Sequence, residues 1–210
     1  MSSKYHKDPF LKQFDSVVTE IQKRTYQIPD GNGKMQSVTT HGIVCEDTIL
    51  FPEGGGQPCD LGTLHITRTE DPVVDLTLTV YHVLRQPNGA IVHVIQESWE
   101  LDEIEVPKGT MVHQELIWSR RIRNMMYHTG QHLLSAVAMN TFQWDTVNWH
   151  LDLNYCFVEF NTTNITKIDV KTLEAEINNC IQQKLPVTSH FFKKGEEDPI
   201  LEKAKTRGLP

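Results

Sequence analysis

The sequence contains no apolar run that approaches the roughly 18 residues of a membrane-spanning helix, so no membrane span is expected. Its polar N-terminus also lacks the apolar centre of a secretory signal. CxxC spacing is absent, and the scattered cysteines indicate neither a disulfide framework nor a self-contained zinc knuckle; they are Cys45, Cys59, Cys156 and Cys180. Reduced thiols in a cytoplasmic protein fit best, with the cysteines acting as small buried hydrophobes.

An excess of positive charge is absent as well. The 27 Asp and Glu residues outnumber the 20 Lys and Arg residues, and the formal net charge of -7 argues against a protein that coats nucleic acid non-specifically. Neither GxGxxG nor GK[ST] occurs, so the nucleotide-phosphate fingerprints carried by those motifs are excluded. With 210 residues, 39% of them hydrophobic and 22% charged, the chain is typical of a globular protein of one large or two small domains.

Short runs of β-branched and apolar residues recur through the first half of the chain, separated by tight turns. They predict strands at residues 14–21, 41–51, 61–67, 73–84, 90–94, 101–106 and 110–118, with a turn near Glu46 and Asp47 inside the second of these. Strands of this number and length favour a small β-barrel or sandwich over residues 13–118. Residues 1–12 are expected to form a loose leader.

Three successive glycines, Gly54, Gly55 and Gly56, stand between two prolines and are followed by Gln57. Glycine tolerates positive φ and lets another molecule approach the backbone closely. The prolines restrict φ on both sides of the glycines. The sequence therefore predicts a shaped loop here, with a flexible loop tip as the alternative.

The second half changes to helical patterning. Residues 119–140 are expected to form a helix in which His128 and His132 lie on one face, one turn apart. Two such imidazoles can hold the same divalent metal, and nitrogen ligands of this kind suit zinc, although two ligands alone do not make a tight site. A surface pair or a hydrogen-bonded core pair is the alternative. The same helix brings four apolar residues onto or near one stripe: Met125, Leu133, Ala136 and Val137.

Three arginines, Arg120, Arg121 and Arg123, directly precede the histidine pair. They could contact phosphates or form the solvated start of the helix, and both interpretations stay open. Further along, strands are expected at residues 155–160 and 186–192, and helices at residues 171–184 and 199–207.

Two motifs in this order resemble the alanyl-tRNA editing proteins. The first is FPEGGGQPCDLG at residues 51–62, and the second is RIRNMMYHTGQHLLSA at residues 121–136. Those proteins are free-standing relatives of the editing domain of alanyl-tRNA synthetase and are related to the second additional domain of threonyl-tRNA synthetase. The resemblance covers nearly the whole chain after residue 12. The pair of motifs is highly specific, whereas either alone would be weak.

The resemblance implies an α+β fold, with a glycine-motif β-barrel at residues 13–118 and an α/β editing core at residues 119–210 around a central HxxxH helix. It also implies one zinc ion, held by HxxxH and a later CxxxH, and hydrolysis of the ester that joins serine or glycine to alanine-specific tRNA. His128 and His132 match the first pair. No CxxxH occurs anywhere in the chain, so we expect the sequence to be truncated before the second half of the zinc site.

A second hydrolytic site of this kind must recognise the hydroxyl by which serine exceeds alanine, because an apolar pocket cannot strongly reject such an analogue. Thr146 and Asn148 are the candidates for that contact, with an ordinary loop or strand-edge hydrogen bond as the alternative. The loop from Gly54 to Gln57 is expected beside the cleft or near the tRNA end, or else as a hinge, and Arg121 is a further candidate for tRNA binding.

Three functions follow from this reading. The first is a zinc-dependent hydrolase that acts on mischarged tRNA in trans, with zinc either activating water or orienting the substrate. The second is a non-catalytic fragment that binds tRNA or a partner without a complete metal site. The third is a fragment related to alanyl-tRNA synthetase without aminoacylation activity, for which no use of ATP is expected.

Overall fold

Alternation of apolar and polar side chains builds the strands of the first half. In β4 (Val74–Arg85), every second residue from Val74 to Val80 is buried and the residues between them are exposed. This two-residue period turns one face of the strand toward a core. A register shift between Val80 and His82 then bends the strand, as an extra residue in one strand of an antiparallel pair does.

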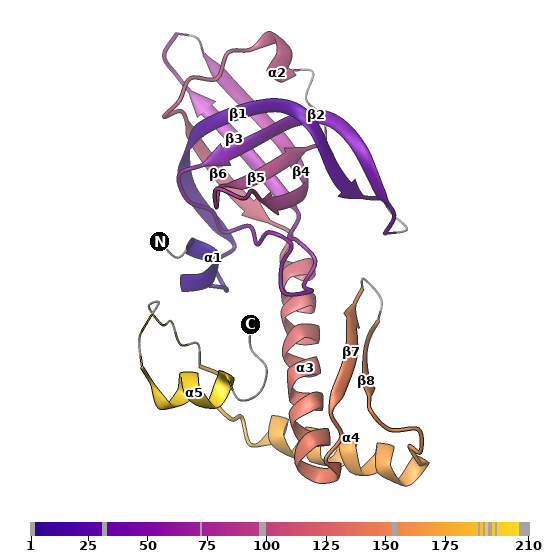
Figure 1. The fold of residues 1–210 in the computed structure, drawn as a ribbon. Coiled ribbons are helices and arrows are strands. Elements are labelled where there is room, and N and C mark those ends of the chain that lie inside the picture. The colour runs from indigo at the N-terminus through magenta and orange to yellow at the C-terminus, as the bar shows by residue number, and fades with distance from the viewer. Residues whose placement is uncertain are drawn as a thin grey trace. The chain divides into compact units, whose positions relative to one another are not determined.

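Six strands close into an antiparallel barrel (Figure 1), in the order β1-β2-β5-β4-β3-β6, with β6 paired back to β1. Besides β4, they are β1 (Gln13–Pro29), β2 (Met35–Cys45), β3 (Gly62–Arg68), β5 (Ile91–Ile95) and β6 (Met111–Leu116). A main cluster of buried side chains, among them Ile43, Leu64 and Val112, forms the core of this part of the chain.

The computed structural model describes residues 3–30, 33–71, 73–96, 100–152, 155–188, 190, 192, 195 and 197–205. The chain divides into two compact units, residues 1–163 and residues 164–210. The expected boundary at residue 119 therefore does not coincide with a division of the structure. The expectation of a chain that mixes helices with an antiparallel sheet is confirmed.

The described part of the expected leader, residues 3–12, is not loose. Lys4–Lys7 forms the short helix α1, and the Tyr5 ring is 3% exposed within the main core cluster. The Tyr5 amide donates to the carbonyl of Thr48, and its hydroxyl accepts from Arg85. The buried Tyr5 ring and its two hydrogen bonds fix this segment. The polar residues around Tyr5 gave no indication of this in the sequence.

Two expected strands are wrong in part or whole. In the region expected at residues 41–51, the strand ends at Cys45 and the turn expected near Glu46 and Asp47 follows, but residues 48–51 do not continue as a strand. The carboxylate of Asp47 accepts from the Thr48 amide, and the hydroxyl of Thr48 accepts from the Leu50 amide. Where a strand was expected at residues 101–106, Glu100–Glu103 forms the short helix α2. Apolar residues at 101, 104 and 106 suit both a helical and a strand period, so the pattern did not distinguish them.

Unit 1 ends with a long helix and a hairpin. Helix α3 (Trp118–Phe142) is followed by β7 (Thr146–Leu151) and β8 (Cys156–Phe160), which pair in antiparallel fashion and contact α3. The strand at residues 155–160 was expected, whereas β7 was not, because its polar and aromatic side chains are mostly exposed.

Unit 2 contains two helices. Helix α4 (Lys167–Gln182) begins earlier than expected, since Thr166 and Asp169 form a reciprocal capping box. Helix α5 spans Pro199–Lys205; residues 206–210, where its end was expected, lie outside the described residues. The strand expected at residues 186–192 does not form over its described residues, and Ser189 and Phe191 lie outside them. No helix in the described ranges combines the length and apolar character needed to cross a membrane.

Candidate functional site

Helix α3 extends from the barrel to the hairpin β7–β8 and ends abruptly. Gln143 takes the left-handed conformation with φ of 58°, and its amide donates to carbonyls of the last turn. The rings of Phe142 and Trp144 stack at 4.5 Å across this end, and Trp144 also contacts Phe160 of β8. The chain is thereby turned back along the helix, which brings β7 beside it.

The buried face of α3 is polar. Arg121, Asn124 and Gln131 are buried, and His128 is half-buried at the same three- and four-residue spacing. Val137 is buried as the apolar pattern predicted, but Met125 and Leu133 are only half-buried and Ala136 is exposed. The expected apolar stripe is therefore wrong over most of its length, because the helix faces polar backbone and side chains of the barrel loop and the hairpin.

The buried polar residues on this face bind the loop after β2 and the hairpin β7–β8. Arg121 binds Asp60, and the Asn124 amide donates to the carbonyl of Pro58 at 3.4 Å. The Gln131 amide donates to the carbonyl of His150 at 2.6 Å and to that of Phe157 at 3.1 Å. The helix thus holds the loop after β2 on one part of its length and both strands of the hairpin on another.

His128 and His132 lie together on the wall of a cavity of about 210 Å³. Their rings stack with 4.9 Å between centroids and 27° between planes. The Trp149 ring lies nearly parallel to that of His128, at 6.3 Å and 17°. The remaining lining residues are Gln131, Ser135 and Thr146. The cavity therefore combines two imidazoles, two hydroxyls, an amide and one aromatic wall.

The glycine loop lies against this cavity. Gly54 and Gln57 exchange two backbone hydrogen bonds of 3.2 and 3.0 Å, and the residues between them have positive φ, 57° at Gly55 and 73° at Gly56. Two positive φ values in succession are typical of a type I′ turn. A side chain at Gly56 would meet the Trp149 ring, since its Cβ would lie 1.7 Å from a ring carbon. The loop is a fixed turn in contact with the site.

Gln57 brings the turn into contact with the histidine pair. Its side chain is 6% exposed, and its Oε1 lies 3.0 Å from Nδ1 of His128, which donates to it. Burial lowers the pKa of His128 below its usual value, and the neighbouring His132 lowers it further. Both effects favour the neutral imidazole of His128, which is the form that can bind a metal.

Thr146 and Asn148, the two candidates for a hydroxyl contact, lie in different surroundings. Thr146 lines the cavity, and its hydroxyl donates to that of Ser135 at 2.8 Å. A register shift between Thr146 and Asn148 adds one residue to β7, so Thr146 and Trp149 share the face that lines the cavity. Asn148 is not among the lining residues, and its amide donates to Glu159 of the paired strand at 3.2 Å.

Arg121, a candidate for tRNA binding, is buried at 2% exposure and pairs with Asp60, itself 1% exposed. Its remaining donors bind the carbonyls of Pro9 and Ile49. The guanidinium therefore has no surface to offer a phosphate, and this expectation is wrong. Its position just before the histidine motif reflects a structural role, which is to join α3 to the loop after β2.

Three lining residues were not predicted as site residues: Gln131, Ser135 and Trp149. A helical repeat could have found Ser135, because it lies seven residues after His128 and so returns to the same face. Trp149 carried no comparable signal, since its orientation depends on the extra residue in β7.

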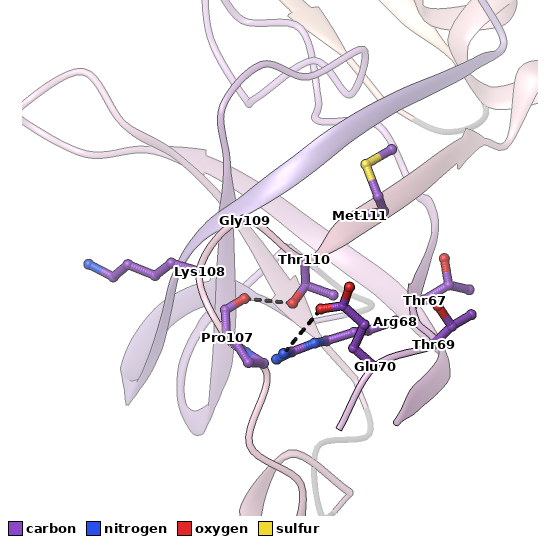
Figure 2. A pocket seen from close by; sticks show the side chains of 9 residues that line it. All are labelled: Thr67, Arg68, Thr69, Glu70, Pro107, Lys108, Gly109, Thr110 and Met111. Carbon is purple, nitrogen blue, oxygen red and sulfur yellow. Dashed lines mark hydrogen bonds and ion pairs between the residues drawn. The ribbon is translucent and has the colours of Figure 1, made fainter. Parts of the chain in front are cut away.

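Two other features lie outside this cavity. A cavity of about 550 Å³ lies at the end of the β3 strand and the loop before β6 (Figure 2), but no histidine or cysteine lines it, and its Arg68 faces Glu70 at 3.9 Å. Closer to the glycine turn, Cys59 Sγ lies 3.3 Å from His82 Nδ1. Burial raises the pKa of the Cys59 thiol, so this pair does not supply a thiolate nucleophile.

The sequence matches no family model. Its curated homologues are alanyl-tRNA editing proteins and an alanine–tRNA ligase, so the resemblance carried by the two motifs is confirmed. Alanyl-tRNA editing protein Aarsd1 from Danio rerio is 33% identical over 210 residues, which is 100% of this chain and 46% of the relative. Alanyl-tRNA editing protein AlaX-L from Pyrococcus horikoshii is 29% identical over 201 residues, 96% of this chain and 43% of the relative.

The alanine–tRNA ligase of Pyrococcus furiosus is 25% identical over 197 residues, 92% of this chain and 18% of the ligase. The chain thus spans less than half the length of the editing proteins it matches. For this chain, the activity of those whole proteins is therefore a proposal.

Proposed function

We propose that this chain belongs to a zinc-dependent hydrolase that removes serine or glycine from mischarged alanine-specific tRNA in trans. The observation that carries the proposal is the stacked pair of His128 and His132 on the wall of a small cavity with two hydroxyls. The names of the relatives, alanyl-tRNA editing proteins, support the class of substrate.

The donor set fits part of a zinc site. Two imidazoles one helical turn apart can bind one ion, and burial together with His132 favours the neutral form of His128 that a ligand needs. When bound, zinc would polarise the ester carbonyl or lower the pKa of a water molecule. Among the described residues no three His, Cys, Asp or Glu side chains are grouped to hold a metal, so the two histidines would be only part of the roughly four ligands that a zinc ion usually takes.

The cavity residues suit a small amino acid. A volume of about 210 Å³ is below the roughly 300–1,000 Å³ of sites for larger ligands. We propose that the Thr146 hydroxyl, now bonded to Ser135, exchanges that partner for the hydroxyl of a bound seryl group. Trp149 would exclude water from one side. Alanine and glycine both lack the hydroxyl and would leave the two protein hydroxyls paired with each other, so this contact would favour serine alone.

The test is deacylation of Ser-, Gly- and Ala-tRNA(Ala) by the chain with added Zn²⁺. We expect hydrolysis of seryl-tRNA in preference to alanyl-tRNA, and its loss in His128→Asn and His132→Asn. His113→Asn serves as the control, because His113 lies on barrel strand β6 and pairs with Asp15 at 2.6 Å. Equal activity of all four proteins would refute the proposed role of the pair.

A second candidate is a non-catalytic unit that binds tRNA. The observation in its favour is that the described residues group no third metal ligand with the histidines. Binding of tRNA(Ala) without hydrolysis, at any Zn²⁺ concentration, would support this function over the first.

A further inference from the structure

Gln57 stands out among the residues of the glycine turn because it alone carries a polar side chain, and that side chain is 6% exposed. A buried amide is costly unless its polar atoms are bonded. Its oxygen faces Nδ1 of His128 at 3.0 Å, although the two residues are far apart in the sequence and belong to the barrel loop and to α3. The contact therefore depends on the tertiary fold.

The turn presents Gln57 in one fixed position. Its two mutual backbone bonds join Gly54 to Gln57, and both central glycines have φ values that residues with a Cβ adopt at a cost. On the cavity side, Gly56 packs on the Trp149 ring so closely that no Cβ fits. The turn is held between the ring and the helix, so Gln57 has little freedom to leave His128.

This contact selects one form of the neutral His128 ring. An amide oxygen only accepts, so Nδ1 carries the hydrogen and Nε2 keeps its lone pair. A histidine that binds a metal usually donates its other ring N–H to such an acceptor, which fixes both the tautomer and the ring plane.

We infer that Gln57 is a positioning residue, which holds His128 as the Nδ1–H tautomer with Nε2 free to bind a metal ion. The inference rests on the proposed zinc site and deepens it, since it assigns the glycine turn of the barrel a defined task at the histidine pair. The contact requires only that the side chain at position 57 accepts one hydrogen bond. A carboxylate there should therefore replace the amide, whereas an apolar side chain should not.

The first measurement needs neither metal nor substrate. Two-bond ¹H–¹⁵N correlation spectra of the ¹⁵N-labelled chain, recorded well above the pKa of His128 and assigned with His128→Asn, report the tautomer directly. We expect the Nδ1–H form in the wild type and in Gln57→Glu, and a shift toward the Nε2–H form in Gln57→Leu. Gln27→Leu is the matched control, because Gln27 is exposed on β1 and bonds Ser37.

The second measurement titrates the same four proteins with Co²⁺ and follows its visible absorption. Loss of a partner behind a metal-binding histidine typically weakens binding by about 10–100-fold. We expect that loss in Gln57→Leu, with Gln57→Glu and Gln27→Leu within a few-fold of the wild type. An Nε2–H tautomer in the wild type would overturn the inference, even if Gln57→Leu failed to fold. A folded Gln57→Leu with unchanged tautomer and affinity would do the same. Absence of Co²⁺ binding in every protein would count against the proposed zinc site, while the tautomer still decides the role of Gln57.

Discussion

The pair formed by Arg121 and Asp60 is expected to be the most sensitive point of unit 1. Arg121→Met keeps most of the side-chain volume but removes the charge that faces Asp60, which is 1% exposed. The Asp60 carboxylate would keep its bond from the Phe51 amide, at 2.7 Å, and the carbonyls of Pro9 and Ile49 would lose their bonds from Arg121. Removing one partner of a buried pair costs about 3–5 kcal/mol. A typical domain is stable by about 5–15 kcal/mol, so this loss is a large fraction of the total.

The assay is urea unfolding followed by tryptophan fluorescence, with the free energy of unfolding extrapolated to water. The double variant Arg121→Met with Asp60→Leu should regain much of the loss, because it replaces both charges by apolar groups instead of leaving one buried alone. Lys23→Met is the control: its partner Asp102 is exposed, so little change is expected. A loss below about 1 kcal/mol in Arg121→Met, or a double variant less stable than the single one, would refute the reasoning.

Three further predictions follow from single residues. Gly56→Ala should lower stability by more than Gly89→Ala in urea unfolding, because both have positive φ but only Gly56 meets the Trp149 ring; equal losses would mean that backbone strain alone is responsible. Burial lowers the pKa of His93 from 6.5 to about 4, so its contribution is present above pH 6.5 and is lost as the pH falls toward 4. The pKa shift corresponds to a change of about 3 kcal/mol in the free energy of unfolding across this window. In His93→Gln the free energy of unfolding should depend less on pH there, by the slope that one bound proton produces. Gln143→Gly should raise the free energy of unfolding by about 0.5–1 kcal/mol, because glycine takes the left-handed conformation without strain; an unchanged or lower melting temperature would contradict this.

The strands of the first half were predictable where their residues alternate, and β4 is the clearest case. The turn after Cys45 was expected, but the end of the strand there was not, because the side chains of Asp47 and Thr48 bond backbone amides that a strand would have used. Prediction also stopped where one buried ring anchors a polar segment, as Tyr5 does. These contacts are made with residues distant in the sequence or by a few atoms, so no periodic pattern records them.

At the site, the helix and the shared face of His128 and His132 followed from spacing alone. The spacing did not predict which residue each of the other candidate site residues contacts. Arg121 carries the positive charge that suits a phosphate contact, but it is buried against Asp60. Asn148, like Thr146, has a polar side chain that could bind a hydroxyl, but its amide bonds Glu159. One extra residue in β7 decides which side chains of that strand reach the cavity.

The polar face of α3 explains why these errors occurred together. A helix that packs on an apolar core is found from its apolar residues, but α3 packs on backbone carbonyls of three other segments. Asn124 bonds the loop after β2, Gln131 bonds the hairpin, and Arg121 bonds the segment before β1. Hydrogen bonds of this kind require defined positions of both partners, whereas apolar packing tolerates rearrangement. A cavity wall built in this way can hold His128 and His132 in fixed orientations beside a turn from the barrel. Because these buried residues of α3 are polar, the sequence alone does not distinguish the buried face of the helix from a solvated one.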